Sequence, residues 1–309
     1  MKARVYKSTG SWYFIKTETG TRMQARLKGI FKIDGITSTN PIAVGDEVEV
    51  EIEEGMDSQK AVITEIYERK NYIARATPQQ HRERHIVASN IDQLLLFATL
   101  KNPRTSQGFI DRFLVAAEAF HITPVIVFNK ADIYRDRELK LYEKLSEIYS
   151  SIGYEVMLLS ISGRLGLEEL ADKLKGKTTL IAGHSGVGKS TFINYILPDL
   201  SLKTGDVSGW SGKGMHTTTF AEMFDLPSGG SIIDTPGIRE FGITDIPKPE
   251  LSHYFVEMRD RLHNCQFNNC LHVNEPGCAI KEAVEKHEIF MERYISYYNI
   301  LHSVKEKNY

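Results

Sequence analysis

The first stretch of the chain, residues 1–72, alternates short apolar runs with turns. In EVEVEIE every second residue is apolar, which is typical of a strand with one buried face. SWYFIKTETG and QARLKGIFKI have a similar β-rich character, and TETG and VGD are turn sequences. We therefore expect a small all-β barrel of the oligonucleotide/oligosaccharide-binding (OB) type over residues 1–72. An SH3-like barrel would give a similar pattern.

The second stretch, residues 73–244, combines continuous apolar runs with helical patterns. DQLLLFA, PVIVF, EVMLLS, TTLIA and SII are bounded by polar residues, as expected of strands buried on both faces. Between the first two of these runs, FIDRFLVAAEAF places Ile110, Phe113, Leu114 and Ala117 on one helical face. This alternation predicts an α/β domain with a mostly parallel sheet and helices on both sides.

The third stretch, residues 245–309, has no strand pattern. PELSHYFVEMRDRLHN and EAVEKHEIFMERYISYYNILHSVKEK have helical patterns and flank a short segment that holds all three cysteines. We expect a small α-helical domain here. The chain is therefore predicted to be multidomain.

Composition adds little to this division. Hydrophobic residues make up 41% and charged residues 25% of the chain, as in ordinary globular proteins. The N-terminus lacks the apolar run of a signal peptide, and no stretch approaches the about 18 apolar residues of a membrane span. We therefore expect a cytoplasmic protein without a membrane partner.

The charge is nearly balanced overall, at −2, but unevenly distributed. Residues 1–35 hold eight Lys or Arg and two acidic residues, whereas residues 46–57 are strongly acidic. Such runs are either solvated faces or, at the basic end, a surface for a polyanion. Charge alone leaves both open.

A glycine-rich phosphate-binding loop is the strongest chemical signal. GHSGVGKS matches G-x-x-x-x-G-K-[ST], follows the apolar run TTLIA and precedes a helical pattern, as a P-loop does. Its backbone N–H groups can wrap phosphates. Lys189 is expected to reach the β- and γ-phosphates, and Ser190 to ligate Mg²⁺. The nucleotide-contacting residues are predicted to be Gly183, His184, Ser185, Gly186, Val187, Gly188, Lys189, Ser190 and Thr191.

DTPG, at residues 234–237, follows the apolar run SII. An aspartate at the end of a strand can hold the Mg²⁺ shell, and the N–H of Gly237 can bond a γ-phosphate. Beside a P-loop, this tetrapeptide is predicted to be a nucleotide-sensing switch rather than a plain turn.

A guanine-reading motif, N-K-x-D, follows the apolar run PVIVF. The carboxylate of Asp132 can accept hydrogen bonds from guanine N1–H and N2–H₂, and the stem of Lys130 can pack along the base, beside Asn129. Adenine would leave the buried carboxylate unpaired, which discriminates strongly. Ser160, at the end of EVMLLS, is placed where a GTPase has its base-supporting loop.

These motifs occur in an unusual order, because the base reader precedes the P-loop. Cutting a Ras-like GTPase between its second switch and its base-reading half, and joining the old ends, gives this order while each element keeps its spatial neighbours. The sequence therefore predicts a circularly permuted GTPase domain.

The cysteine segment has the spacing of a metal site. Cys265, Cys270, His272 and Cys278 form C-x₄-C-x-H-x₅-C, and three thiolates with one imidazole suit tetrahedral zinc. A complete protein shell leaves no open position, which predicts a structural zinc. His263 is a possible competing ligand.

The sequence resembles the RsgA (YjeQ) family of circularly permuted GTPases, which depend on the small ribosomal subunit. The shared motifs run through nearly the whole chain: VGD, ERKNYIAR, ASNIDQLLLF, IDRFLVAAE, VFNKAD, GHSGVGKS, GKGMHTTT, DTPGIREFG and CQFNNCLHVNEPGC. Met215 departs from the arginine expected before HTTT. The resemblance implies a factor acting late in small-subunit maturation, stimulated by that subunit.

The resemblance also assigns the switches. It places GKGMHTTT in the first switch, where one threonine among residues 217–219, with Thr218 preferred, is expected to sense the γ-phosphate and Mg²⁺. After DTPG, Ile238 stands where Ras-type enzymes carry a water-positioning Gln. His216 or a ribosomal group would then supply that function, although His216 is equally compatible with a structural loop role. Because DTPGIREFG leads almost directly into residues 245–309, γ-phosphate contacts at Gly237 could also orient the C-terminal domain.

The barrel of this family contacts ribosomal RNA, and this chain offers charge and stacking groups for such a contact. They are Lys2, Arg4, Lys7, Lys16, Arg22, Arg26, Lys28 and Lys32, with Trp12, Tyr13 and Phe31. The basic residues of ERKNYIARATPQQHRERH extend this set.

The sequence thus favours a Mg²⁺-dependent GTP hydrolase that acts as an assembly factor on the small ribosomal subunit. We expect it to be a monomer. A GTP-binding, RNA-binding assembly module with little turnover is the alternative, favoured by Ile238. An ATP-using P-loop kinase is disfavoured by N-K-x-D.

Overall fold

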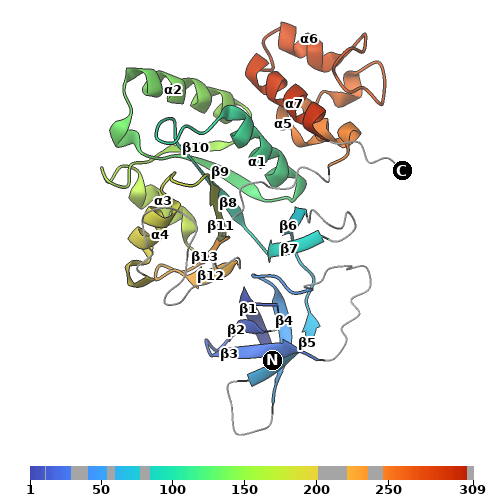
Figure 1. Ribbon diagram of the computed structural model, residues 1–309. Coiled ribbons are helices and arrows are strands. Elements are labelled where there is room, and N and C mark those ends of the chain that lie inside the picture. Colours follow the sequence, from blue (N-terminus) through green and yellow to red (C-terminus); the bar gives the residue numbers. More distant parts are fainter. Residues whose placement is uncertain are drawn as a thin grey trace.

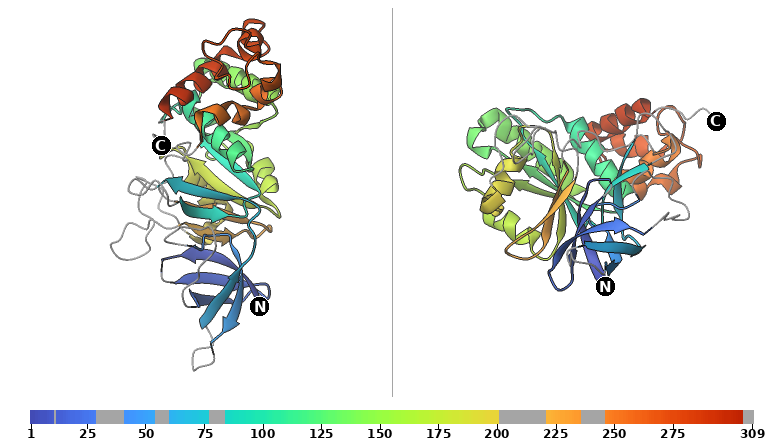
Figure 2. Two further views of the ribbon diagram at one scale, coloured as in Figure 1. Left: turned by 90° about the vertical axis from the view of Figure 1, so that its right-hand side faces the viewer. Right: turned by 60° about the horizontal axis from the view of Figure 1, so that its bottom comes forward.

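The computed structural model describes residues 1–10, 12–28, 41–53, 60–76, 84–200, 221–235 and 246–304. They form a barrel, a central sheet flanked by helices, and a group of C-terminal helices. These parts follow one another along the long axis of the molecule (Figure 1; Figure 2). The predicted order of all-β, α/β and helical parts is confirmed.

The described N-terminal strands close into a barrel. They are β1 (Lys2–Ser8), β2 (Tyr13–Thr17), β3 (Arg22–Leu27), β4 (Glu47–Ile52) and β5 (Lys60–Ile66). Their order is β1-β2-β3-β5-β4, with β4 pairing back onto β1 and β3 running parallel to β5. The alternation in EVEVEI buries Val48 and Val50 in the barrel core. The closed five-stranded barrel confirms the OB-type prediction.

A hairpin of β6 (Tyr72–Ala76) and β7 (Arg84–Ser89) follows the barrel. The VGD turn packs against it. Gly45 has φ of 94°, and a Cβ there would lie 2.2 Å from the carbonyl oxygen of Ser89. The buried carboxylate of Asp46 accepts hydrogen bonds from Arg69 at 2.6 Å and from the Ser89 hydroxyl at 2.5 Å. VGD is therefore both a turn and the joint between barrel and hairpin.

The central sheet has the order β10-β9-β8-β11-β13-β12. Its strands are β8 (Gln93–Ala98), β9 (Thr123–Phe128), β10 (Glu155–Leu158), β11 (Thr178–Gly183), β12 (Glu222–Asp225) and β13 (Ser231–Asp234). Among these strands β12 is antiparallel to its neighbour and the others pair in parallel. The strand before the P-loop, β11, lies between β8, which comes earlier in the chain, and β13, which comes later. The strands that carry the motifs are therefore spatial neighbours, as the predicted permutation requires.

Helices cover both faces of the central sheet, as predicted (Figure 1). They are α1 (Gln107–Ala119), α2 (Asp136–Ser151), α3 (Leu167–Leu174) and α4 (Lys189–Ile196), with the short turns η1 (Ala131–Ile133) and η2 (Pro198–Leu200). Leu94 and Leu96 belong to the buried cluster under α1 and α2. Leu95 and Phe97 belong to the cluster under α3 and α4. The continuous apolar run of β8 is thus buried on both faces.

The barrel meets the central sheet at β12. Lys7 of β1 pairs in register with Glu222 of β12. Side chains reinforce this junction, because Lys7 lies 2.7 Å from Glu222 and Lys16 lies 2.8 Å from Asp225. The hydroxyl of Tyr6 also donates to Asp225 at 2.5 Å. The junction therefore depends on charge as well as on strand pairing.

The C-terminal part consists of η4 (Lys248–Tyr254), α5 (Val256–Arg259), η5 (Leu262–Asn264), α6 (Ala279–Glu285) and α7 (Met291–Ser303). The segment PELSHYFVEMRDRLHN forms short 3₁₀ turns around one α-helical turn rather than a regular helix. These elements share a buried cluster that includes Phe255, Ile280 and Ile300. Within the described residues, no helix is long and apolar enough to cross a membrane.

Candidate nucleotide site and metal centre

The P-loop connects β11 to the first residue of α4. Gly183, Gly186 and Gly188 have φ values of 137°, 79° and 102°. A Cβ on Gly183 would lie 2.3 Å from the carbonyl oxygen of Phe97, and one on Gly188 would lie 2.2 Å from Nδ2 of Asn129. Larger residues at 183 and 188 would therefore collide with their neighbours. The loop has the conformation that allows backbone N–H groups to surround a phosphate.

The other predicted P-loop residues divide by exposure. Val187 is fully buried, whereas Ser185 and Gly186 are exposed. Ser190 and Thr191 lie in the first turn of α4 and are, respectively, half-buried and exposed. The loop is thus anchored through Val187 and open at its tip.

Lys189 begins α4 after the loop that follows β11, and Asp234 is the last residue of β13, the parallel neighbour of β11. Nζ of Lys189 donates to the carbonyl oxygens of Gly183 and His184 at 2.7 and 2.6 Å. Burial lowers the pKa of Lys189 to about 8, and the charge of Asp234 opposes this shift. Burial raises the pKa of Asp234, while Lys189 lowers it. The structure therefore brings together two residues that are 45 positions apart in the numbering.

The base-reading motif contacts the P-loop directly. Nδ2 of Asn129 donates to the carbonyl oxygen of Val187 at 2.9 Å. Asn129 is buried, and its Oδ1 has no hydrogen-bond partner within the described part of the chain. The base-reading motif and the phosphate loop thus form one site, although the base reader comes first in the sequence.

Ser160 supports Asp132, as its position in the sequence predicts. The Ser160 hydroxyl donates to Oδ1 of Asp132 at 2.5 Å, and the backbone N–H of Gly163 donates to the same hydroxyl oxygen at 2.9 Å. This hydrogen bond from Ser160 holds the pKa of Asp132 below its ordinary value. The carboxylate of Asp132 is exposed and can accept hydrogen bonds from a ligand.

Two sets of hydrogen bonds that hold the N-K-x-D motif could not be predicted from the sequence. The buried hydroxyl of Tyr134 donates to the carbonyl oxygen of Asn129 at 2.6 Å and accepts from the N–H of Leu100 at 3.0 Å. Nζ of Lys130 donates to the carbonyl oxygen of Asn102 at 2.5 Å, in the β8–α1 loop. A tyrosine two positions after N-K-x-D carries no recognisable signal by itself.

A third contact outside the predicted set involves His184. Its ring stacks on Phe109 of α1, with centroids 3.6 Å apart and planes at 26°. Phe109 lies beside the predicted apolar stripe of the helix, not on it. Apolar residues outside one stripe indicate a helix that is buried on more than one side. This pattern is the sequence signal that could have identified Phe109 as a contact residue.

Several predicted residues lie outside the described ranges. They are the first-switch residues His216 and Thr218, the neighbouring Met215, Gly237 and Ile238 after Asp234, and Phe31 and Lys32 of the predicted RNA-contacting set. Their predicted roles remain predictions. Beside Asp234, the hydroxyl of Thr235 is buried and has no hydrogen-bond partner among the described residues.

The predicted metal ligands converge at one point. The ligand atoms of Cys265, Cys270, His272 and Cys278 all lie within 4.8 Å of one another. Nδ1 of His272 is 3.6 Å from Sγ of Cys265 and 3.4 Å from Sγ of Cys278. Neighbouring ligands in a tetrahedral zinc site are about 3.5 to 3.8 Å apart, given Zn–S and Zn–N bonds of about 2.3 and 2.0 Å. The cluster therefore fits zinc.

The chain around this cluster is held by further hydrogen bonds. Glu275 accepts from the backbone N–H groups of Leu271 and Val273, both at 2.9 Å. Burial opposes its ionisation, but these backbone hydrogen bonds outweigh it and lower the pKa of Glu275 to about 2. Tyr294 of α7 donates to the carbonyl oxygen of His272 at 2.8 Å. His263 is exposed and is not part of the cluster.

The basic residues of the barrel are largely paired. Their partners are the acidic residues of β4, the segment after it, and β12, in the pairs Lys2–Glu47, Arg4–Glu47, Lys7–Glu222, Lys16–Asp225, Arg22–Asp225, Arg26–Glu53 and Lys28–Glu51. The uneven charge of the sequence therefore becomes a set of ion pairs. Tyr13 is buried in the barrel core, so its prediction as a stacking residue is wrong. Phe14 is the exposed aromatic residue beside it.

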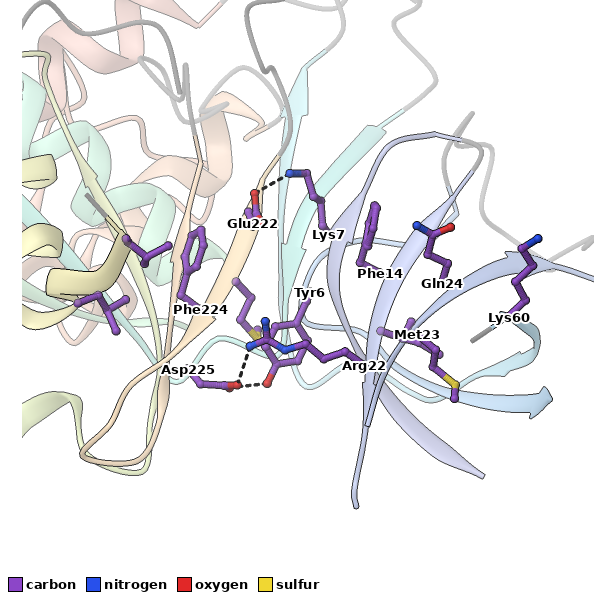
Figure 3. A pocket seen from close by; sticks show the side chains of 14 residues that line it. Tyr6, Lys7, Phe14, Arg22, Met23, Gln24, Lys60, Glu222, Phe224 and Asp225 are labelled. Carbon is purple, nitrogen blue, oxygen red and sulfur yellow. Dashed lines mark hydrogen bonds and ion pairs between the residues drawn. The ribbon is translucent and has the colours of Figure 1, made fainter. Parts of the chain in front are cut away.

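A hollow of about 670 Å³ lies beside the pairing of β1 with β12 and is lined by residues of β12 and of the barrel strands β1, β2, β3 and β5. Figure 3 shows Phe14, Gln24 and Lys60 on the barrel side and Phe224 on the β12 side, with Tyr6, Arg22 and Asp225 meeting across it. The P-loop and base-reader side chains do not line this hollow. It is a feature of the junction rather than of the nucleotide site.

Comparison with known proteins identifies relatives for all parts of the chain. The RsgA GTPase family model matches residues 66–244, and the RsgA N-terminal domain model matches residues 2–63. A small ribosomal subunit biogenesis GTPase RsgA from Christiangramia forsetii is 50% identical over 309 residues, which are 100% of this chain and 98% of the relative. One from Phocaeicola vulgatus is 47% identical over 100% of this chain and 99% of the relative.

Solved structures are also similar to this chain over nearly its whole length. The crystal structure of YjeQ from Thermotoga maritima matches with a TM-score of 0.81 and 36% identity, covering 99% of both chains. The structure of YloQ, described as a circularly permuted GTPase, matches with a TM-score of 0.76 and 31% identity, covering 100% of this chain and 96% of that one. The likeness therefore extends over barrel, central sheet and C-terminal helices.

Proposed function

Because the chain belongs to the RsgA family of GTPases, we propose that it hydrolyses GTP as a late maturation factor of the small ribosomal subunit. The subunit stimulates hydrolysis, and hydrolysis is coupled to release. The observation that carries the proposal is the hydrogen bond from Asn129 to Val187, which joins a guanine reader to a phosphate loop. The relatives are small ribosomal subunit biogenesis GTPases, which supports the small ribosomal subunit as the partner.

In this proposal GTP lies across the P-loop with its base over the N-K-x-D motif. Asp132, held by Ser160, accepts hydrogen bonds from the guanine N1–H and N2–H₂ groups. Lys130 packs along the base, and Asn129 holds the N-K-x-D motif against the P-loop. The residues from Gly183 to Thr191 surround the phosphates, and Lys189 leaves the carbonyls of Gly183 and His184 to contact the β- and γ-phosphates.

Ser190 and Asp234 hold the Mg²⁺ of the bound nucleotide. A bound magnesium ion neutralises charge that develops on the phosphate oxygens during transfer. The half-buried position of Asp234 beside Lys189 supports this assignment, since a carboxylate partly removed from water is stabilised by positive partners. Thr218 and the N–H of Gly237 sense the γ-phosphate. His216 or a ribosomal group positions water, because Ile238 cannot.

The C-terminal cluster holds one structural zinc through Cys265, Cys270, His272 and Cys278. The support is the tetrahedral spacing of its thiol and imidazole groups. Four protein ligands leave no position for a substrate, so the zinc stabilises the fold rather than the reaction.

The chain has three domains, at residues 1–72, 73–244 and 245–309, and each has its own role. The barrel binds ribosomal RNA through Phe14 and the exposed guanidinium of Arg22, whose side chain is 73% exposed despite its contact with Asp225. The protein acts as a monomer in the cytoplasm, where small subunits mature, and has no membrane partner.

The test is GTP hydrolysis by the purified protein with and without small ribosomal subunits. Strong stimulation, lost in Lys189→Ala, supports a ribosome-activated GTPase. Lys140→Ala, at an exposed position of α2, is the control and should behave as wild type. GTP binding without stimulation would instead indicate a binding module with little turnover, the alternative that Ile238 favours. Competition by ATP as strong as that by GTP would refute the guanine reader.

A further inference from the structure

Helix α1 is buried on two sides. Ile110, Phe113 and Leu114 pack in the cluster beneath α1 and α2 on the central sheet. Val115 belongs instead to the buried cluster of the C-terminal helices, together with Phe255 and other residues. Figure 1 shows α1 between the sheet and the elements α5 and α7. One helix therefore contributes to two cores.

At its N-terminal end, α1 contacts the nucleotide site. Phe109 stacks on His184 of the P-loop. The loop before the helix touches both halves of the site, because Asn102 accepts the hydrogen bond from Lys130 and the ring of Pro103 lies beside Gly186, at 3.5 Å from an ideal Cβ there. A change in the P-loop or base reader therefore acts on the start of α1.

Further along, α1 is held to the C-terminal helices by a buried ion network. Arg293 of α7 donates to Asp111 at 2.5 Å and to Glu257 of α5 at 2.6 Å. Tyr149 of α2 donates to the same Asp111 oxygen at 2.9 Å. Burial disfavours the guanidinium charge, but Asp111 and Glu257 outweigh it and raise the pKa of Arg293.

Two outer contacts extend this attachment along the helix. Arg112 donates to the Ser303 hydroxyl at 2.9 Å, and Arg259 donates to Glu118 at 2.8 Å. Asp111 and Phe109 are two residues apart on one rigid helix. Within the described residues, α1 therefore extends from a contact with the P-loop to contacts with the C-terminal helices.

We propose that Phe109 is a positioning residue for the P-loop, and that α1 transmits the nucleotide state from His184 through Asp111 and Arg293 to the C-terminal helices. This rests on the proposed nucleotide site. Packed helices with discrete arrangements are the kind of element that couples distant sites, and a measured coupling is what establishes such a route.

The experiment compares GDP affinity of the zinc-containing full-length protein with that of Phe109→Leu, Phe109→Tyr, His184→Ala and the double variant. The matched control is Phe120→Leu, which changes an aromatic residue at the far end of α1 that packs on Tyr72. We expect Phe109→Leu and His184→Ala each to weaken GDP binding about three- to tenfold, since stacked rings contribute modestly beyond their buried area. The double variant should be no weaker than either, Phe109→Tyr should bind as wild type, and so should Phe120→Leu.

The second readout is amide hydrogen exchange in α7 with and without GDP. We expect GDP to slow this exchange in wild type and Phe120→Leu, and the difference to disappear in Phe109→Leu. Unchanged GDP affinity in Phe109→Leu and His184→Ala would overturn the positioning role. A persisting GDP effect on α7 in Phe109→Leu would overturn the route. Wild-type protein that binds no guanine nucleotide would overturn the proposed function itself, which is a different result.

Discussion

The side-chain amide of Asn129 donates a hydrogen bond of 2.9 Å to the carbonyl oxygen of Val187, which lies 58 residues later in the sequence. The contact leaves no room for a side chain at residue 188, where a Cβ would lie 2.2 Å from the same nitrogen. It joins the first half of the predicted nucleotide site to the second. The permuted chain thereby rebuilds one site from motifs in reversed order.

Asp132 is predicted to set the base preference. Asp132→Asn replaces one acceptor by a donor that faces guanine N1–H and N2–H₂, so we expect GTP affinity to fall about 10- to 100-fold. Xanthosine triphosphate, which carries an acceptor at C2, should gain affinity. Competition binding with both nucleotides measures this, and Asp136→Asn at the start of α2 is the matched control. Equal GTP affinity in wild type and Asp132→Asn would refute the role.

Tyr134 is predicted to hold the base reader in place. Tyr134→Phe leaves the buried N–H of Leu100 without its acceptor and releases the carbonyl of Asn129, which should destabilise the fold by about 1–2 kcal/mol. GTP affinity should fall as well, because the reader loop loses its support. Urea unfolding and nucleotide titration test both effects. Tyr195→Phe, on the exposed side of α4, serves as control; the idea fails if the two variants behave alike.

Removal of one zinc ligand is predicted to unfold the C-terminal helices. His272→Ala should reduce zinc from one per chain towards none and expose the cluster around Ile280, because metal binding and folding are linked in such sites. Elemental analysis and circular dichroism report these changes. His263→Ala provides the contrast, since this histidine lies outside the cluster. Loss of zinc in His263→Ala instead of His272→Ala would reverse the assignment.

The buried network around Arg293 is predicted to be essential for stability. Arg293→Met leaves Asp111 and Glu257 buried without a counter-charge and should cost about 3–5 kcal/mol. Arg137→Met, at an exposed position of α2, is the matched control and should have little effect on stability. Denaturant unfolding of both variants decides the point. A loss below about 1 kcal/mol in Arg293→Met would mean that water reaches the two carboxylates.

The junction between barrel and sheet is predicted to depend on pH. Burial acts to raise the pKa of Asp225, but hydrogen bonds from Lys16 and Tyr6 outweigh it and lower the pKa. A carboxyl group with a lowered folded pKa stabilises the fold above its unfolded pKa, of about 3.9, and this is lost as pH falls through the folded value. Asp225→Asn should therefore cost about 0.5–1 kcal/mol at neutral pH, a value discounted for partial exposure, and less as the pH falls below about 4.

Urea unfolding between pH 3.5 and 8 follows this difference, with Asp172→Asn in α3 as control. Asp172 forms a local, exposed pair with Lys175 and should show no such dependence. A constant difference between wild type and Asp225→Asn across the range would show that hydrogen bonding rather than charge holds the junction.

The sequence by itself determined the parts of this protein whose chemistry is local. Each motif, from N-K-x-D to C-x₄-C-x-H-x₅-C, combines residues close along the chain, and the pattern of β8 or of Ile110, Phe113 and Leu114 on α1 depends on a short repeat. The support of Asp132 by Ser160 also followed from motif order, because parallel strands bring their carboxyl ends together at one edge.

Only the tertiary structure decided the contacts between distant segments. The described basic residues of the barrel proved to pair with Glu47, Glu51 and Glu53 and with β12, and Tyr13 lies in the barrel core. Arg293 meets Asp111, and Phe109 meets His184, through the packing of helices. No local pattern encodes such pairs, because the free energy that selects them comes from burial and charge compensation across the whole fold.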